Sequence, residues 1–295
     1  MGSKRRTTLV LAVTAGALLA LAGPAWADLL TPESGGSANA DDIDTLYKLV
    51  LVLAIIVFVG VEGVLLYSLV KFKAKRGMVA AQIRGNTRLE ISWTVGAAAI
   101  LVFLAVFTFV QLDDIRNPPN SDPAGFQGGR TLYAGVARPT PPNGRSLDVE
   151  VNGQQYVWRF TYPDGDGNVL NDVFTYEQMV VPKGTTVTLD IRAQDVAHSW
   201  WIPKLGGKFD AVPGHVNHTW FKVPLESGDA TYRGQCAELC GRNHANMIAS
   251  VKAIEPAAFE AWIARKKREI QGANQAVRAQ RREVERDQER GAESP

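Results

Sequence analysis

Three apolar stretches dominate the first 112 residues of the chain. One runs from Leu9 to Ala22, and two longer stretches of 22 residues each cover Leu49–Val70 and Ile91–Leu112. A helix of that length rises about 33 Å, enough to cross a bilayer core of about 30 Å. The second stretch carries one charge, Glu62, the third carries none, and neither has a polar face at helical spacing. The pattern predicts a transmembrane hairpin over residues 28–112, with spans at about 49–70 and 91–112.

The first apolar stretch has the features of a secretory signal. Its 14 residues would rise only about 21 Å as a helix. It follows the basic residues of Lys4-Arg5-Arg6 and precedes Ala25-Trp26-Ala27, a small-x-small cleavage pattern. We therefore expect a signal peptide over residues 1–27, the alternative being an uncleaved first membrane helix.

Charges on either side of the predicted spans indicate the orientation of the hairpin. The loop between the spans carries six basic residues against Glu90, namely Lys71, Lys73, Lys75, Arg76, Arg84 and Arg88. The segment before the first span carries five acidic residues against Lys48, namely Asp28, Glu33, Asp41, Asp42 and Asp44. The positive-inside rule places the loop in the cytoplasm. We expect a multi-pass protein of the bacterial plasma membrane with both mature ends on the outer face.

The chain beyond the hairpin alternates between apolar and polar positions. Residues 113–145 are rich in Pro and Gly and are predicted to be a linker. Between residues 146 and 255, runs such as Leu147-x-Val149-x-Val151 and Val187-x-Leu189-x-Ile191 have the period of two that strands require. Turn residues separate these runs, and no long helix is predicted. The domain at 146–255 should be an antiparallel β-sandwich or barrel.

Residues 256–295 change the character of the chain again. They hold nine basic and seven acidic residues with few apolar positions, which predicts a charged helical or disordered tail. Over all 295 residues the net charge is +2 and 46% of residues are hydrophobic. The hydrophobic content excludes a disordered protein, and the small net charge gives no case for nucleic acid binding. The two cysteines are too few for a disulfide-stapled fold.

Both cysteines lie in one segment whose residue types suit a metal. Cys236 and Cys240 are four residues apart, and His244 and Met247 follow them. Thiolate, imidazole and thioether form the soft ligand set that copper prefers, whereas structural zinc usually takes Cys and His only. A disulfide between the cysteines is the alternative, which an exported location would permit.

A ligand from elsewhere in the chain must complete such a site. His215 and His218 are three residues apart in what reads as extended chain, so they should point to opposite faces. His198 lies near the end of a strand-like run, within Gln194–Trp200. A β-sandwich can bring one ligand from a strand to a ligand-bearing loop, and His198 is the candidate.

These motifs resemble subunit II of the haem-copper cytochrome c oxidases. The resemblance rests on Cys-x-Glu-x-Cys-x-x-x-His-x-x-Met at 236–247, Asp195-Val-x-His198-Ser-Trp200 and Lys208-x-Asp210-Ala-x-Pro213-Gly214. It implies a cupredoxin-like Greek-key barrel with a dinuclear copper centre. The implied copper ligands are His198, Cys236, the Glu238 backbone carbonyl, Cys240, His244 and Met247. A mononuclear site would need one Cys, and the presence of two favours the dinuclear form.

The resemblance also implies cofactors and partners. The Glu238 side chain would reach a magnesium ion at the boundary with subunit I, which would hold the haem. The partners would be subunit I, other oxidase subunits and cytochrome c, which would deliver electrons to Tyr156 and Trp158; strand packing alone would also explain these two aromatics. Glu90 would lie at the mouth of a proton path, or be an interfacial charge beside Trp93.

The function implied is that of an oxidase subunit. Electrons from cytochrome c would pass through the copper pair to the haem-copper site of subunit I, where oxygen is reduced to water with proton translocation. No catalytic residue for the oxygen chemistry is expected in this chain. The alternative is a membrane-anchored copper-binding or copper-delivery protein without an oxidase partner, which would not need Glu238, Glu90 or the aromatic pair.

Overall fold

The computed structural model describes residues 30–292 apart from 74–76, 78, 80–81 and 129–138. The predicted signal peptide at 1–27 therefore lies outside the described residues. The chain divides into two compact units. One contains Asp44–Phe107, and the other contains Ser34–Ile43 together with the whole of the chain from Thr108.

Two long helices account for the predicted hairpin. Helices α3 (Ala38–Lys71) and α4 (Thr87–Arg116) are long and apolar enough to cross a membrane. Their apolar windows are not buried by the described residues, so lipid or partner subunits must cover them. Both helices extend beyond the predicted spans, because the polar residues that flank each span are also helical.

The start of α4 is closed by hydrogen bonds from its own first turn. The Asn86 side-chain oxygen accepts the Leu89 N–H at 3.2 Å, and Glu90 Oε1 accepts the Asn86 N–H at 3.2 Å. These bonds satisfy amide groups that a helix end leaves without partners. Glu90 therefore has a local role as a helix cap.

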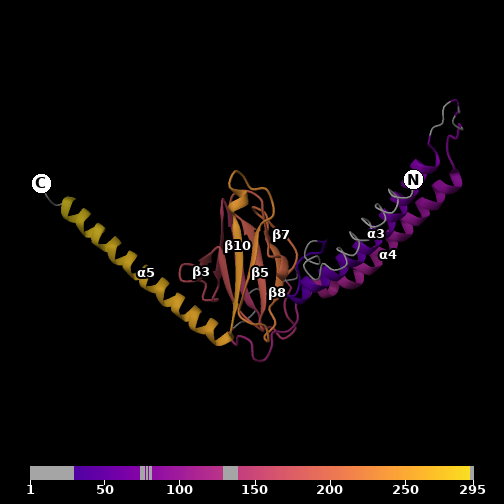
Figure 1. The fold of residues 1–295 in the computed structure, drawn as a ribbon. Helices are drawn as coiled ribbons and strands as arrows, with labels where there is room; N and C mark the ends of the chain where they lie inside the picture. Colours follow the sequence, from indigo (N-terminus) through magenta and orange to yellow (C-terminus); the bar gives the residue numbers. More distant parts are fainter. Residues whose placement is uncertain (1–29, 74–76, 78, 80–81, 129–138, 293–295) are drawn as a thin grey trace, which may run out of the picture. The chain divides into compact units, whose positions relative to one another are not determined.

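Two five-stranded sheets form the β-domain (Figure 1). The first has the strand order β3-β2-β1-β5-β8 and the second β4-β10-β9-β6-β7. The strands are β1 (Leu147–Gln154), β2 (Val157–Tyr162), β3 (Val173–Tyr176), β4 (Gln178–Pro182), β5 (Thr186–Ala193), β6 (His198–Trp201), β7 (Phe209–Ala211), β8 (Asn217–Lys222), β9 (Ala230–Cys236) and β10 (Ile248–Ile254). Two single-turn 3₁₀ helices, η2 (Pro203–Leu205) and η3 (His244–Asn246), interrupt the loops.

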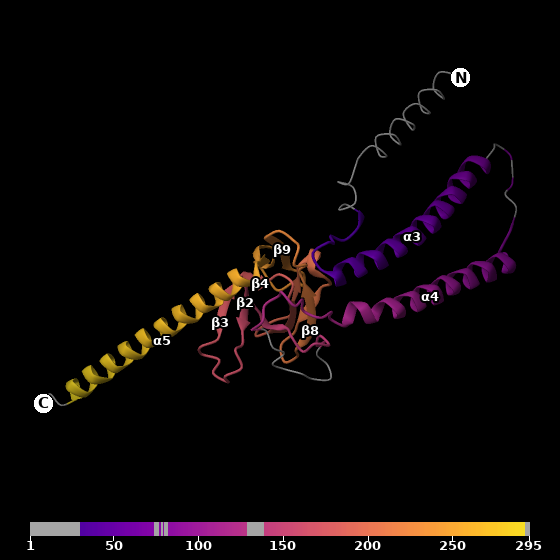
Figure 2. The same cartoon turned by 90° about the horizontal axis from the view of Figure 1, so that it is seen from below.

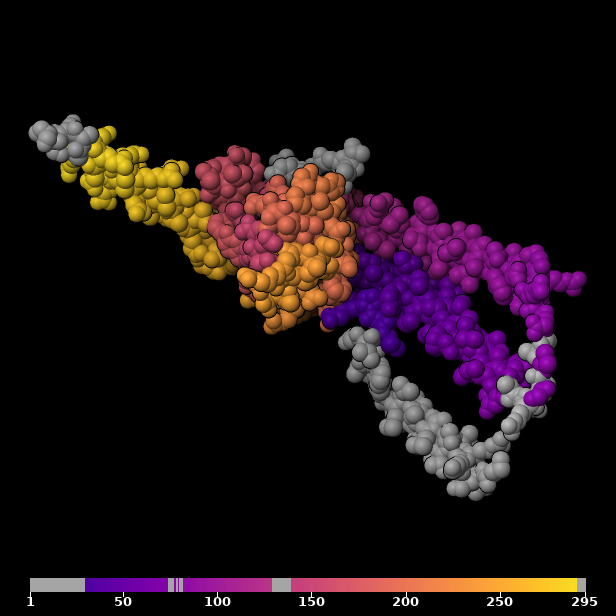
Figure 3. Space-filling view, turned by 90° about the horizontal axis from the view of Figure 1, so that it is seen from above, coloured from indigo at the N-terminus to yellow at the C-terminus, as the bar shows by residue number. Residues whose placement is uncertain are grey.

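The alternation of the sequence fixes which side chains form the core. In β2, Trp158, Phe160 and Tyr162 are buried and the residues between them are partly exposed. The apolar residues of β1 and β5 are also buried, and residues of both sheets share one hydrophobic core. In the space-filling view the surface of the domain is the compact block coloured from rose to orange (Figure 3). The all-β prediction for this domain is confirmed.

The prediction of antiparallel pairing holds for most strand pairs and fails for two. Strand β1 pairs with β5 in parallel, with Val149 opposite Leu189, and β10 pairs with β4 in parallel. Parallel neighbours require a crossover connection. Alternation has the same period of two in parallel and antiparallel strands, so the sequence pattern could not distinguish them.

Segments outside the strands also pack on the domain. The predicted linker begins inside α4, because this helix continues to Arg116. Beyond the helix, the Ser121 hydroxyl of the linker accepts a hydrogen bond from the Thr186 N–H at 2.9 Å. The Trp220 indole N–H on β8 donates to the carbonyl oxygens of Ile115 and Arg116, each at 3.1 Å. These bonds hold the end of α4 against the domain's edge strand.

The C-terminal segment forms helix α5 (Pro256–Ala292), which follows β10 directly (Figure 2). Its first turns pack on the domain through Phe259, which is fully buried. The Phe259 ring contacts Phe126, Tyr162 and Trp262 at centroid distances of 5.0, 6.4 and 5.5 Å. Contacts continue to Asn274, whose side-chain Nδ2 donates to the Leu170 carbonyl oxygen at 3.0 Å, whereas Val284 farther along is half exposed.

Replacing Phe259→Ala should destabilise the domain and detach the start of α5. Truncating a fully buried Phe leaves a cavity and typically costs about 3–5 kcal/mol. Urea unfolding of the full chain in detergent, followed by tryptophan fluorescence, measures this change, and α5 should become more sensitive to protease. Val284→Ala is the matched control and should change stability by about 0.5 kcal/mol or less. Equal stability of the two variants would contradict the packing described.

Candidate metal centre

Both cysteines lie at one end of the second sheet. Strand β9 ends at Cys236, and the loop that follows carries Cys240 before β10 begins at Ile248. The Cys236 N–H donates to the Met247 carbonyl at 2.9 Å, which closes the base of this loop. Both thiols are buried, and their sulfur atoms are 3.9 Å apart. A disulfide needs about 2.05 Å, so the two sulfurs are not bonded to one another.

His198 reaches the cysteines through sheet pairing. It is the first residue of β6, which pairs with β9 in the antiparallel direction. In this pairing Trp200 of β6 lies opposite Cys236 of β9. The imidazole is fully buried, and its Nδ1 lies 3.8 Å from Cys236 Sγ. A histidine 38 residues away in sequence is therefore placed beside the thiols by backbone hydrogen bonds.

The loop itself supplies the other three predicted ligands. His244 Nδ1 lies 3.5 Å from Cys240 Sγ, and Met247 Sδ lies 3.8 Å from the same sulfur. The Glu238 carbonyl oxygen lies 3.3 Å from Cys236 Sγ. The 3₁₀ turn η3 makes this convergence possible, because it folds His244 and Met247 back onto the cysteines.

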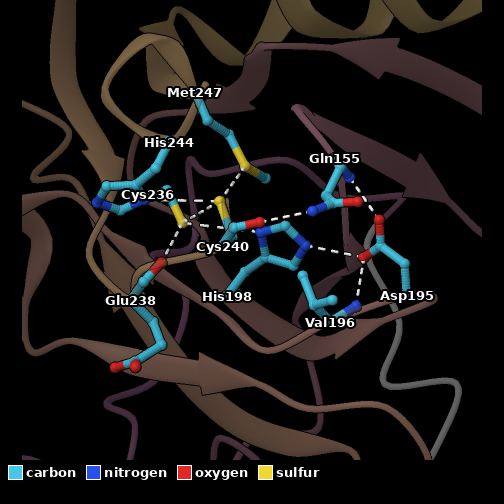
Figure 4. A network of polar contacts seen from close by, with 9 residues as sticks. All are labelled: Gln155, Asp195, Val196, His198, Cys236, Glu238, Cys240, His244 and Met247. Atoms are coloured by element: carbon cyan, nitrogen blue, oxygen red, sulfur yellow. Dashed lines mark hydrogen bonds and ion pairs between the residues drawn. The ribbon is translucent and has the colours of Figure 1, made fainter. Parts of the chain in front are cut away.

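All six predicted ligand groups therefore meet in one cluster (Figure 4). Each cysteine sulfur has its own imidazole: His198 beside Cys236 and His244 beside Cys240. The ligand atoms of His198, Cys236 and Cys240 lie within 4.8 Å of one another. The two thiols, the thioether and the His198 imidazole are buried and the His244 imidazole is partly exposed, and this ligand set fits copper well by softness.

Hydrogen bonds and burial set the protonation of this cluster. Burial and the neighbouring Cys236 raise the pKa of the Cys240 thiol to about 11. Burial also raises the pKa of Asp195, but hydrogen bonds from the Gln155 N–H and from His198 outweigh it, so that pKa lies below its ordinary value. Asp195 is therefore ionised, and a metal must displace a proton from the Cys240 thiol as it binds.

The residues predicted to receive electrons lie beside the cluster. Trp158 is fully buried, and its ring meets the His198 ring edge-on at 5.8 Å. Tyr156 is half-buried in the turn between β1 and β2 and packs against the core. The Glu238 side chain points away from the sulfur atoms (Figure 4) and is exposed.

Two other histidines lie outside this cluster. His218, on β8, pairs with Asp190 at 2.7 Å, and His215, in the loop before β8, contacts Asn217. The expectation of extended chain is thus right for His218 and wrong for His215, which precedes the strand.

Three residues that sequence reasoning did not assign also contact the ligands. Asp195 accepts a hydrogen bond from His198, and Gln155 contacts both Asp195 and Cys240. Gly153 faces the His198 ring, where a Cβ atom would lie 3.1 Å from Cδ2. The three-residue spacing of Asp195 and His198 was a usable indication, whereas Gln155 and Gly153 carry no pattern that sequence alone could identify.

The fold and the cluster together define a cupredoxin-like copper domain in a chain that also has two helices long and apolar enough to cross a membrane. The family model for the periplasmic domain of cytochrome c oxidase subunit II matches residues 169–254, and the model for its transmembrane domain matches residues 24–110. This chain belongs to the cytochrome c oxidase subunit II family, and it is a membrane protein. Membership of this family does not favour the alternative of a copper-delivery protein without an oxidase partner.

Individual relatives agree with the family models. Cytochrome c oxidase subunit 2 of Alkalihalophilus pseudofirmus is 34% identical over 243 residues, covering 82% of this chain and 63% of that protein. The probable cytochrome c oxidase subunit 2 of Rickettsia felis is 30% identical over 266 residues, covering 85% of this chain and 76% of that protein. The crystal structure of the periplasmic domain of subunit II from Bradyrhizobium japonicum is 29% identical, covers 42% of this chain and 95% of that one, and has a TM-score of 0.38.

Replacing Gly153→Ala should disturb the His198 ligand. The new Cβ would lie 3.0 Å from the Trp158 ring and 3.1–3.2 Å from His198, so the imidazole must move. Loss of ligand orientation typically lowers metal affinity by about 10–100-fold. Chelator competition against the copper-loaded full chain measures this affinity. Gly228→Ala is the control, since no atom lies within 4 Å of its Cβ position. Unchanged affinity in Gly153→Ala would show that the ring position is not critical.

Proposed function

We propose that this chain receives electrons from cytochrome c in a respiratory oxidase and passes them to the haem-copper site of subunit I. Oxygen is reduced to water there, coupled to proton translocation. The observation that carries the proposal is the arrangement of the two thiols, whose sulfur atoms are 3.9 Å apart and which each have their own imidazole. That symmetry suits two metal ions that share both sulfurs.

Six groups of this chain would hold the metal. Two copper ions would be held by the thiols of Cys236 and Cys240, the imidazoles of His198 and His244, the Met247 thioether and the Glu238 carbonyl. When bound, such a copper pair supplies a one-electron redox couple with the charge shared over both ions. The protein holds these groups on paired strands and a closed loop, with both thiols, the thioether and His198 buried, which limits their rearrangement.

The aromatic residues Tyr156 and Trp158 would receive the electron. Trp158 contacts His198 directly, and Tyr156 lies two residues earlier, at a half-buried position. This pair therefore forms a short route from the domain's surface to a ligand of the metal.

Two carboxylates would serve functions at the boundaries of the chain. The exposed Glu238 side chain is free of the cluster, so it could bind magnesium shared with subunit I while its backbone carbonyl faces Cys236. Glu90, in the first turn of α4, would lead protons toward subunit I. The hydrogen bond from the Asn86 N–H would hold its carboxylate in place.

Replacing Cys240→Ser should abolish electron transfer from cytochrome c, because the serine hydroxyl cannot replace a bridging thiolate. The measurement is haem reduction after rapid anaerobic mixing of the purified oxidase with reduced cytochrome c. A small reductant that reaches subunit I directly should still reduce the haem, which shows that the complex is intact. Ser250→Ala, on β10 outside the cluster, is the control. Wild-type transfer rates in Cys240→Ser would overturn the proposal.

The proposed orientation predicts which side of the membrane each segment faces. Cysteines introduced at the exposed positions Ile83 and Val277 report on the loop and on α5. In intact spheroplasts a membrane-impermeant thiol reagent should label Val277→Cys, and it should label Ile83→Cys only after the membrane is opened. The parent chain provides the background. The reverse labelling pattern would contradict the expected topology.

A further inference from the structure

Gln155 contacts both halves of the ligand cluster from the turn between β1 and β2. Its backbone N–H donates to Asp195 Oδ2 at 2.7 Å, and its side-chain Nε2 donates to the Cys240 carbonyl oxygen at 2.7 Å. The first bond reaches the segment before His198, and the second reaches the cysteine loop (Figure 4). Gln155 thus joins the segment before His198 to the cysteine loop, which are otherwise connected through the pairing of β6 with β9 in the second sheet.

Asp195, which accepts the Gln155 N–H, also contacts the ligand His198. Asp195 Oδ1 pairs with His198 Nε2 at 2.9 Å and also accepts the Val196 N–H at 2.7 Å. When Nε2 donates to this carboxylate, the lone pair of the imidazole lies on Nδ1. The Nδ1 lone pair then points toward Cys236, which is the orientation that metal binding requires.

The bond to Cys240 depends on a close approach of the two loops. Gly241 follows Cys240 with a φ of +128°, and a Cβ there would lie 2.7 Å from Tyr156 Oη and 2.9 Å from Gln155 Nε2. A larger residue would push the cysteine loop away from the turn. Glycine at this position lets the Gln155 amide reach the Cys240 carbonyl.

We propose that Gln155 is a positioning residue of the metal centre. Its bonds to Asp195 and to the Cys240 carbonyl fix the segment that carries His198 (the His198 arm) relative to the loop that carries Cys240 (the Cys240 arm). This inference rests on the proposed copper centre. The physical reason is that metal ions bound by both arms stay in place only if the distance between the two arms is fixed. Sheet pairing sets one side of that distance, and Gln155 sets the other.

The amide is the group required at this position. Gln155→Met keeps a side chain of similar length but lacks the N–H donor. Gln155→Glu keeps the shape and puts an oxygen against the carbonyl oxygen of Cys240. Neither change removes the backbone N–H that bonds to Asp195, so both variants test the Cys240 arm alone. Asp195→Asn tests the His198 arm.

The experiment uses the purified oxidase complex with no electron donor present. Copper per complex, the electron spin resonance spectrum and the rate of copper release to a chelator are compared with wild type. Gln155→Met and Gln155→Glu should release copper about 10–100-fold faster, with altered hyperfine splitting. Because both arms act on one shared distance, adding Asp195→Asn to Gln155→Met should increase the release rate by less than the product of the single effects.

The neighbouring Gln154 provides the matched control for the change of charge. Gln154→Glu makes the same substitution one residue earlier and should leave release and spectrum at the wild-type values. Loss of copper from a Gln155 variant whose melting curve is unchanged supports positioning. If release and spectrum match wild type, or if only the KM for cytochrome c changes, Gln155 does not position the ligands. A wild-type complex that lacks a copper pair would instead contradict the proposed function.

Discussion

The structure depends on bringing soft ligands from distant parts of the chain into one cluster around two buried thiols. A thiol and an imidazole can share a metal only at a fixed separation, and the fold achieves this with backbone hydrogen bonds. Strand β6 carries His198 to the end of β9, where Cys236 lies, because Trp200 and Cys236 are paired in the sheet. The Cys236 to Met247 backbone bond then closes the loop that supplies the remaining ligands.

Other features of the domain support this pocket from outside. Gly153 leaves space for the imidazole and for the Trp158 ring, which meets the imidazole edge-on. The turn at Gln155 connects the first sheet to both ligand-bearing segments of the second. The two sheets are therefore joined twice near the cluster, once by apolar packing and once by hydrogen bonds. Such double attachment favours a ligand set that changes little when an electron arrives.

Much of the site could be predicted because its ligands lie close together in sequence. The spacing of Cys236, Cys240, His244 and Met247 is local, and apolar alternation identified the strands. The parallel pairing of β1 with β5 could not be predicted, since it joins segments about 40 residues apart without a distinctive pattern. The same holds for Gln155, whose contact with Cys240 spans 85 residues and ends on a backbone carbonyl. The cap formed by Glu90 joins residues only four positions apart, so a local sequence pattern is enough to indicate it.

Metal content and electron spin resonance of one sample of the copper-loaded full chain test the central claim most directly. The account predicts two copper ions per chain and hyperfine splitting from one unpaired electron shared by two copper nuclei. One copper ion per chain, a spectrum from a single nucleus, or a native disulfide between Cys236 and Cys240 would contradict it.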